Sequence, residues 1–160
     1  MIADLPRWTF ASLAAAMTDV ADTFPVYVEG NDERTDAFLE ASHRAEVRIN
    51  GPFVQELSKG YFRVWVDVNV LLTSQGTVTD RYELHRIAGL YLHALTEAVE
   101  VWNYGSQPGD YDDDPTLLGC LLPRAGRNRS VSVFHFGQTE KTDQVRQSAV
   151  DATLEMHIEG

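Results

Sequence analysis

Hydrophobic and polar residues alternate most strictly along residues 61–73, which read YFRVWVDVNVLLT. The apolar side of this run consists of Phe62, Val64, Val66, Val68, Val70 and Leu72. The other side carries Arg63, Trp65, Asp67 and Asn69. Because successive side chains of a strand point to opposite faces of a sheet, the pattern predicts a long strand with one buried face. The face that carries Trp65 then needs a different neighbour.

Two segments show the spacing of three and four residues that is typical of an amphipathic helix. We expect Asp4 to cap the first helix, Pro6 to stand in its first turn, and Pro25 to end it. Its apolar positions are Phe10, Leu13, Met17, Val20 and Phe24. Asp80 and Glu83 form a capping-box-like start for the second helix. Its apolar stripe is Leu84, Ala88, Tyr91, Leu95, Ala98 and Trp102.

The remaining apolar runs are short and predict further strands. We expect these strands at residues 25–29, 44–49, 53–57, 117–122, 131–136 and 150–158. The consecutive extended segments that precede and include residues 61–73 suggest an antiparallel meander, whereas residues 31–42 are expected to form a loop or a short helix. Residues 103–130 are irregular, and a connection of this length is usually functional or disordered, so we expect a contact arm there.

These elements together predict one α+β domain over residues 1–160. We expect an antiparallel or mixed sheet with the two helices packed on one face and with long hairpin or loop arms. Two helices with one-sided apolar stripes can share a sheet face in this way. The opposite sheet face is then left for contacts with another molecule.

Composition narrows the classes of function. The 160 residues include 24 acidic and 13 basic ones, for a formal net charge of -11. That balance argues against a protein that grips nucleic acid through its phosphates, but an acidic wall would let DNA slide past; the charge can equally serve solubility alone. The single Cys120 excludes an intrachain disulfide. We expect neither a secretory signal in MIADLPRWTF nor a membrane span.

The sequence offers no residue set typical of an enzyme. It contains no HExxH zinc motif and no Gly-x-Ser-x-Gly elbow, and its glycines are isolated. Asp110, Asp112 and Asp114 match the first carboxylate positions of a calcium loop, but Pro115 and Leu121 stand where Gly and Glu are required. We therefore expect no catalytic residue, no metal ligand and no cofactor.

Charged and aromatic residues provide candidates for a subunit interface instead. The same irregular segment contains an acidic run, Asp112 to Asp114, and a basic run of Arg124, Arg127 and Arg129. In a ring, the acidic run of one subunit can therefore meet the basic run of the next. The alternative is that both runs are solvated loop charges that contribute little. Trp65 is a candidate interface anchor, since Trp is common among residues that dominate binding energy. The candidate interface residues are Trp65, Asp112, Asp113, Asp114, Arg124, Arg127 and Arg129.

Several sequence segments resemble segments of small virion structural proteins of tailed bacteriophages. These segments are RVWVDVNVLLT, GCLLPRAG, the HFGQ stretch at residues 135–138, and QSAVDATLEM. The expected order of helix, strands, long hairpin, helix and carboxy-terminal strands is similar to that of tail-terminator and tail-completion proteins.

The resemblance implies a non-enzymatic protein of the virion tail or neck, made in the cytoplasm of the host bacterium. Such proteins form a hexameric ring that caps the tail tube and joins it to the head connector. The implied partners are copies of the chain itself, the tail tube protein and head–tail connector or adaptor proteins. DNA would pass through the ring without specific binding, and no membrane is involved.

Two alternatives remain at the level of sequence. The chain can instead be a head-completion adaptor or a tail-tube subunit, which the sequence does not separate from a terminator. A small α+β ligand-binding protein or hydrolase is the alternative from another class. It predicts a concave pocket with converging polar groups and a titratable residue whose pKa is shifted.

Overall fold

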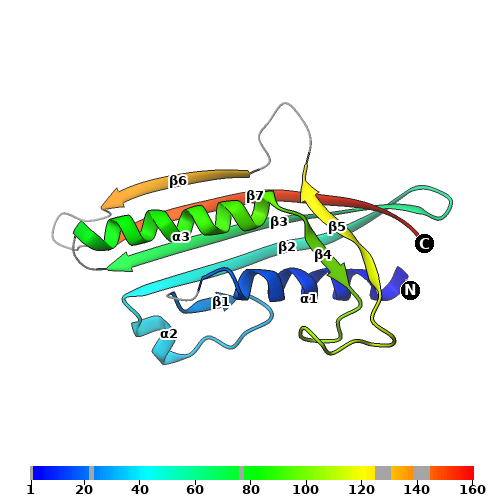
Figure 1. The fold of residues 1–160 in the computed structure, drawn as a ribbon, viewed down its shortest axis with the longest axis horizontal. Coiled ribbons are helices and arrows are strands. Elements are labelled where there is room, and N and C mark those ends of the chain that lie inside the picture. Colours follow the sequence, from blue (N-terminus) through cyan, green and yellow to red (C-terminus); the bar gives the residue numbers. More distant parts are fainter. Residues whose placement is uncertain (1, 22–23, 76–77, 125–130, 139–144) are drawn as a thin grey trace.

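Three long strands form the centre of an α+β structure (Figure 1). The computed structural model describes residues 2–21, 24–75, 78–124, 131–138 and 145–160. The central strands are β2 (His43–Ser58), β3 (Tyr61–Gln75) and β7 (Val145–Glu159), and each is antiparallel to its neighbour. The strand predicted at residues 61–73 is confirmed as β3, and the strand predicted at 150–158 is the carboxy-terminal part of β7.

The outer strands attach to this centre at both sides. The order is β1-β2-β3-β7-β5-β4, with β6 also paired to β7. Short β1 (Val26–Val28) runs parallel to β2, so the sheet is the mixed form of the two that the sequence predicts. β6 (Val131–Gln138) and β5 (Leu117–Pro123) share one edge of β7, and β4 (Val99–Trp102) pairs with β5.

The first helix is shorter than its apolar pattern suggests. A 3-10 turn, η1 (Ile2–Asp4), leads into α1 (Leu5–Thr18), with Pro6 in the first turn as expected. The predicted side-chain cap is wrong, because the Asp4 carboxylate makes no capping bond and pairs with Arg7. The predicted end at Pro25 is also wrong, since Phe24 is buried from a segment that is no longer helical and that leads into β1.

The second long helix, α3 (Val78–Thr96), begins earlier and ends earlier than expected. Asp80 lies inside the helix, so the predicted capping box does not mark its start. The stripe from Leu84 to Leu95 is buried, but Trp102 belongs to β4. The apolar spacing continues from α3 into β4 without a break, so the spacing alone does not mark the end of the helix.

The segments on either side of β2 match the expectations in part. Residues 31–42 contain the short helix α2 (Asp36–Glu40), whose first turn is capped by Thr35 through a 3.2 Å bond from the Phe38 N–H. The two strands predicted at 44–49 and 53–57 are one strand, β2. Its register shifts near Gly51, whose positive φ of 106° suits a residue without Cβ.

The core lies between the sheet and the two long helices. One buried cluster combines α1, α3 and alternate residues of the central strands; its largest members include Tyr91, Leu13, Met17, Leu84 and Leu154. Burial raises the pKa of Tyr91, whose hydroxyl donates to the Met17 carbonyl at 3.4 Å and so links α3 to α1. In the described part of the chain, no helix has the length and apolar character that crossing a membrane requires.

The β2–β3 hairpin extends beyond the rest of the sheet, at the end of the molecule where both termini lie (Figure 1). Residues 55–59 at its tip are exposed, and Leu57 retains 48% of its accessible surface. This hairpin is the protruding arm of the structure. Of the contact arm predicted at 103–130, residues 103–116 form a loop, Leu117–Pro123 form β5, and residues 125–130 lie outside the described residues.

Candidate interaction surface

The sheet has one face that the helices do not cover, which we call the open face. It is formed by the alternate residues of β3 between Arg63 and Leu71, with their partners on β2 and β7. The intervening residues Val64, Val66, Val68 and Val70 are buried against the core. Arg63, Trp65 and Asn69 are half-buried and Asp67 is exposed. The predicted division of this strand into two faces is confirmed.

Trp65 stands at the centre of a cluster on the open face. Its indole stacks on the Phe53 ring with centroids 5.3 Å apart, and the Arg63 guanidinium lies 4.8 Å above it. The Nε and Nη2 atoms of Arg63 both lie 2.8 Å from Glu155 Oε2 on β7. Three strands thus hold one aromatic platform between charged groups. We call Phe53, Arg63, Trp65 and Glu155 the Trp65 cluster.

Arg124 and His157 extend this cluster. Arg124 Nε lies 3.9 Å and His157 Nε2 lies 3.5 Å from the Glu155 carboxylate. The Arg124 N–H also donates to the Thr153 carbonyl at 2.9 Å, which fixes the backbone beside β7. The structure therefore brings together two of the residues predicted from sequence, Trp65 and Arg124. Arg127 and Arg129 lie outside the described residues.

A polar row crosses the open face next to the Trp65 cluster. Thr153 Oγ1 donates to Asp67 Oδ1 at 2.8 Å, and the Asn69 amide donates to the Asp151 carboxylate. These residues line a shallow hollow of about 330 Å³, together with Arg48, Asn50 and Ser132. Since Asp67 and Asp151 each accept a bond from a cross-strand neighbour, their carboxylates are tied to the sheet.

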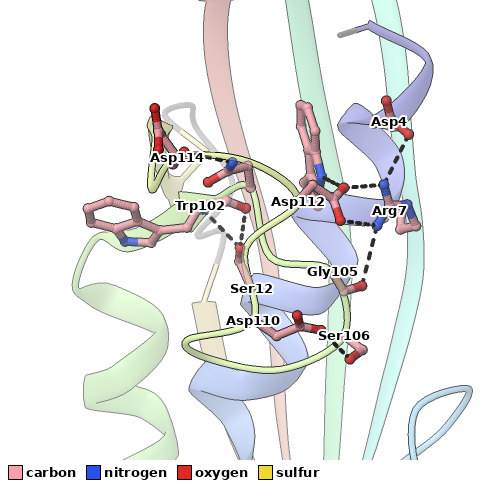
Figure 2. A network of polar contacts seen from close by, with 11 residues as sticks. Asp4, Arg7, Ser12, Trp102, Gly105, Ser106, Asp110, Asp112 and Asp114 are labelled. Carbon is pink, nitrogen blue, oxygen red and sulfur yellow. Dashed lines mark hydrogen bonds and ion pairs between the residues drawn. The ribbon is translucent and has the colours of Figure 1, made fainter.

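The acidic run lies in the loop of residues 103–116, which docks on α1 (Figure 2). Asp112 forms an ion pair with Arg7 and accepts a 2.6 Å bond from the Trp8 indole N–H. Arg7 also contacts Asp4 at 3.1 Å and the Gly105 carbonyl at 3.4 Å. The hydrogen bonds from Arg7 and Trp8 lower the pKa of Asp112, and the two carboxylates raise the pKa of Arg7.

The interior of this loop is closely hydrogen-bonded. Buried Asn103 donates to the Asp114 carbonyl at 3.0 Å and accepts from the Thr116 N–H at 2.8 Å. The Gly105 N–H donates to the Asp110 carbonyl at 2.6 Å. A Cβ at Gly105 would lie 2.9 Å from Asp110 Oδ2, so only glycine fits there without displacing that side chain. Residues 103–116 thus form an irregular loop, as expected, that is held together by its own hydrogen bonds.

The three carboxylates of the acidic run therefore have different surroundings. Asp112 is engaged by α1 of its own chain, whereas Asp113 and Asp114 have exposed side chains on the loop. The pairing of this run with the basic run of a neighbouring subunit stays a prediction. If such pairing occurs, Asp113 and Asp114 are the carboxylates available for it, because Asp112 is already paired.

Sequence reasoning missed Arg7, Trp8 and Glu155. Arg7 and Trp8 are about a hundred positions from Asp112 in the chain, and no local pattern links them. Glu155 could have been found, because it is a polar residue on the alternating strand β7 and its position opposite Trp65 follows from the register.

The described residues offer no evident metal site. Within the described ranges, no three His, Cys, Asp or Glu side chains gather closely enough to hold a metal ion. The open face offers an aromatic platform, paired charges and a shallow polar hollow, which suit contact with another macromolecule. Comparison of the chain with protein-family models found no match, and comparison with curated proteins found none either.

Proposed function

We propose that this chain is a non-enzymatic structural subunit of a phage tail or neck. In this proposal it forms a ring, hexameric as in the class that it resembles, which caps the tail tube, joins it to the head connector and lets DNA pass. The observation that carries the proposal is the open face. Within the described part of the chain, the core cluster that contains residues of both long helices lies on the other side of β3, which leaves this face and its Trp65 cluster available to a neighbouring subunit.

The Trp65 cluster has the chemistry of an interface centre. Trp and Arg are enriched among the residues that dominate binding energy, and such residues act best when their geometry is already set. Trp65 contacts both the Phe53 ring and the Arg63 guanidinium, and Arg63 is paired with Glu155 before any partner arrives. A neighbour that covers this cluster would therefore need little side-chain ordering.

The arm and the charge fit the same proposal. The exposed β2–β3 hairpin, with Leu57 near its tip, can reach a neighbouring subunit or the next ring. The net charge of -11 would make the wall of a central channel repel phosphates, so DNA would slide through it without binding.

Negative-stain electron microscopy together with native mass spectrometry of the purified protein tests this function. The proposal predicts closed rings with a central hole and one dominant subunit number. The matched control is Tyr82→Ala, which removes an exposed aromatic side chain on α3 and should leave the rings intact. A uniform monomer over the whole concentration range would overturn the ring and favour a small polar ligand at the hollow beside Asp67 and Asp151.

The position in the virion needs a second experiment. A head-completion adaptor, a tail-tube subunit and a terminator differ in the ring that each one contacts. Cross-linking of assembled virions followed by peptide identification would show which neighbour touches the β2–β3 arm. The terminator proposal predicts links from Lys59, at the tip of the arm, to the tail tube protein or to a connector protein.

A further inference from the structure

A second hollow, of about 390 Å³, lies between α1, the end of α3 and strand β4. We call it the β4 hollow. Small side chains of both helices line it and leave the space open, namely Ala15 and Ala16 of α1 and Ala94 of α3. Ala98, which follows α3, lines it as well. The β4 hollow shares no residue with the Trp65 cluster, so an inference about it goes beyond the proposed function and does not depend on it.

One side of β4 provides polar and aromatic groups to this hollow. Glu100, Trp102 and Tyr104 all line it, and they lie on the side of the chain away from the core because the residues between them are buried. Glu100 Oε2 accepts from the Trp102 indole N–H at 3.1 Å. The Tyr111 ring packs against both other rings, with centroids 6.1 Å from Trp102 and 5.2 Å from Tyr104. Burial, the Tyr111 hydroxyl and the charge of Glu100 raise the pKa of Tyr104.

The β4 hollow is negatively charged. Its lining includes a second carboxylate, that of Asp19, in addition to Glu100. Among the described residues that line it, none is Lys, Arg or His. The hollow on the open face differs, because Arg48 lies among the residues that line it. A cation that enters the β4 hollow therefore meets carboxylates without a competing positive charge in the lining.

Both long helices also present their carboxy-terminal ends to the β4 hollow. The lining includes Met17 in the last turn of α1, the C-cap residue Asp19, and Ala94 in the last turn of α3. The last carbonyls of a helix have no partner within the helix and carry partial negative charge, so a helix carboxy terminus favours a cation. The last turn of α1 contains no basic residue that could serve this purpose.

We propose that the β4 hollow binds a lysine side chain of a partner protein. The alkyl stem lies on the alanines, and the ammonium lies beside Glu100 and the rings of Trp102 and Tyr104, because aromatic faces attract cations. One oxygen of Glu100 already accepts from the indole, so the carboxylate suits a compact ammonium better than a fork-shaped guanidinium that takes both oxygens. The net charge of -11 attracts a basic partner.

A proton–nitrogen NMR titration of the full chain tests this site. The probe is the short peptide Gly-Lys-Gly with both ends blocked, and the matched peptides carry acetyl-lysine or arginine in place of lysine. The lysine peptide should shift the Trp102 indole resonance, which is assigned by its loss in Trp102→Phe, and the acetyl-lysine peptide should bind about tenfold more weakly. Equal binding of these two peptides would overturn the cation site. Tighter binding of the arginine peptide would overturn the assignment to lysine.

Two variants test the walls of the hollow. Glu100→Gln should weaken binding of the lysine peptide about tenfold. The matched control is Glu97→Gln, which removes the same charge from an exposed residue outside the lining and should leave binding unchanged. Ala98→Leu fills the hollow and should abolish the shift of the indole resonance.

The midpoint of urea unfolding shows that each variant is folded before its binding is compared. Equal binding by Glu100→Gln and Glu97→Gln would contradict the proposal, because the attraction would then come from the net charge alone. Wild-type binding by Ala98→Leu would also contradict it, since the peptide would then lie outside the hollow.

Discussion

The two faces of strand β3 belong to one stretch of chain and have different surroundings. On the helix side, Val64, Val66 and Val70 are fully buried, and they pack in a cluster with α1 and α3. On the open face, Trp65 and Arg63 are half-buried and lie among charged residues. Because neighbouring residues alternate between the faces, stability and contact can be changed independently at adjacent positions. Substitutions on the two faces should therefore separate folding from assembly.

The largest loss of stability is expected for a substitution in the core, on the helix side of the sheet. Tyr91→Ala should lower the free energy of unfolding by about 3–5 kcal/mol, since it leaves a cavity between α3 and α1. Urea unfolding followed by circular dichroism measures this change. The matched control is Tyr91→Phe, which removes only the long hydroxyl bond to Met17 and should cost about 1 kcal/mol or less. A cost of Tyr91→Ala as small as that of the control would contradict the assignment of the core.

The next largest loss of stability is expected at Val66, and the adjacent Trp65 on the opposite face provides the comparison. Val66→Ala should cost about 2 kcal/mol of stability because it removes two buried methyl groups. Trp65→Ala should cost about 1 kcal/mol, since it removes a ring contact with Phe53 and the overlying Arg63 at a half-buried site. Urea unfolding of the two variants side by side provides the comparison. A larger loss for Trp65→Ala than for Val66→Ala would place Trp65 in the core.

A smaller, pH-dependent effect is expected at the loop of residues 103–116. The pKa of Asp112 is lowered by Arg7 and Trp8, so its stabilising effect is present above the ordinary carboxyl pKa of about 4. This stabilisation is lost as the pH falls through the lower pKa of the folded protein. The Trp8 indole N–H resonance in a proton–nitrogen NMR spectrum should therefore shift at acid pH. In Asp112→Asn that titration should disappear, and a persisting titration would contradict the assignment.

The smallest effect concerns the acidic run as an interface element. Changing Asp112, Asp113 and Asp114 together to Asn should weaken self-association slightly if they face Arg124 to Arg129 of a neighbour, because exposed ion pairs contribute little. The control is Asp112→Asn alone, because Asp112 is paired with Arg7 inside the chain. Sedimentation of the triple variant that matches the wild type would exclude this pairing.

Sequence periodicity was informative where one face of an element is buried. The alternation along β3 and β7 and the stripe from Leu84 to Leu95 were sufficient to locate these elements. The pattern failed at boundaries, because Trp102 continued the helical spacing although its segment forms β4. A short strand and the end of a helix both bury apolar side chains. The apolar spacing therefore does not distinguish one from the other.

The candidate interaction surface was predictable only in its centre. Trp65 could be selected because a large aromatic residue stood on the polar side of an alternating strand. The contact between Arg7 and Asp112 depends on how the loop folds onto α1, and no local rule encodes such a contact. The hydrogen bond between Ser12 of α1 and the Trp102 backbone also joins distant segments, and no local rule encodes it.

Sedimentation velocity of Trp65→Ala beside Val66→Ala tests whether subunits meet at the open face. Both variants are measured at concentrations at which the wild type is assembled and at a temperature at which both variants are folded. We expect Trp65→Ala to sediment as smaller species, whereas Val66→Ala keeps the wild-type assembly despite its lower stability. Full assembly of Trp65→Ala would contradict the claim that the open face is where subunits meet.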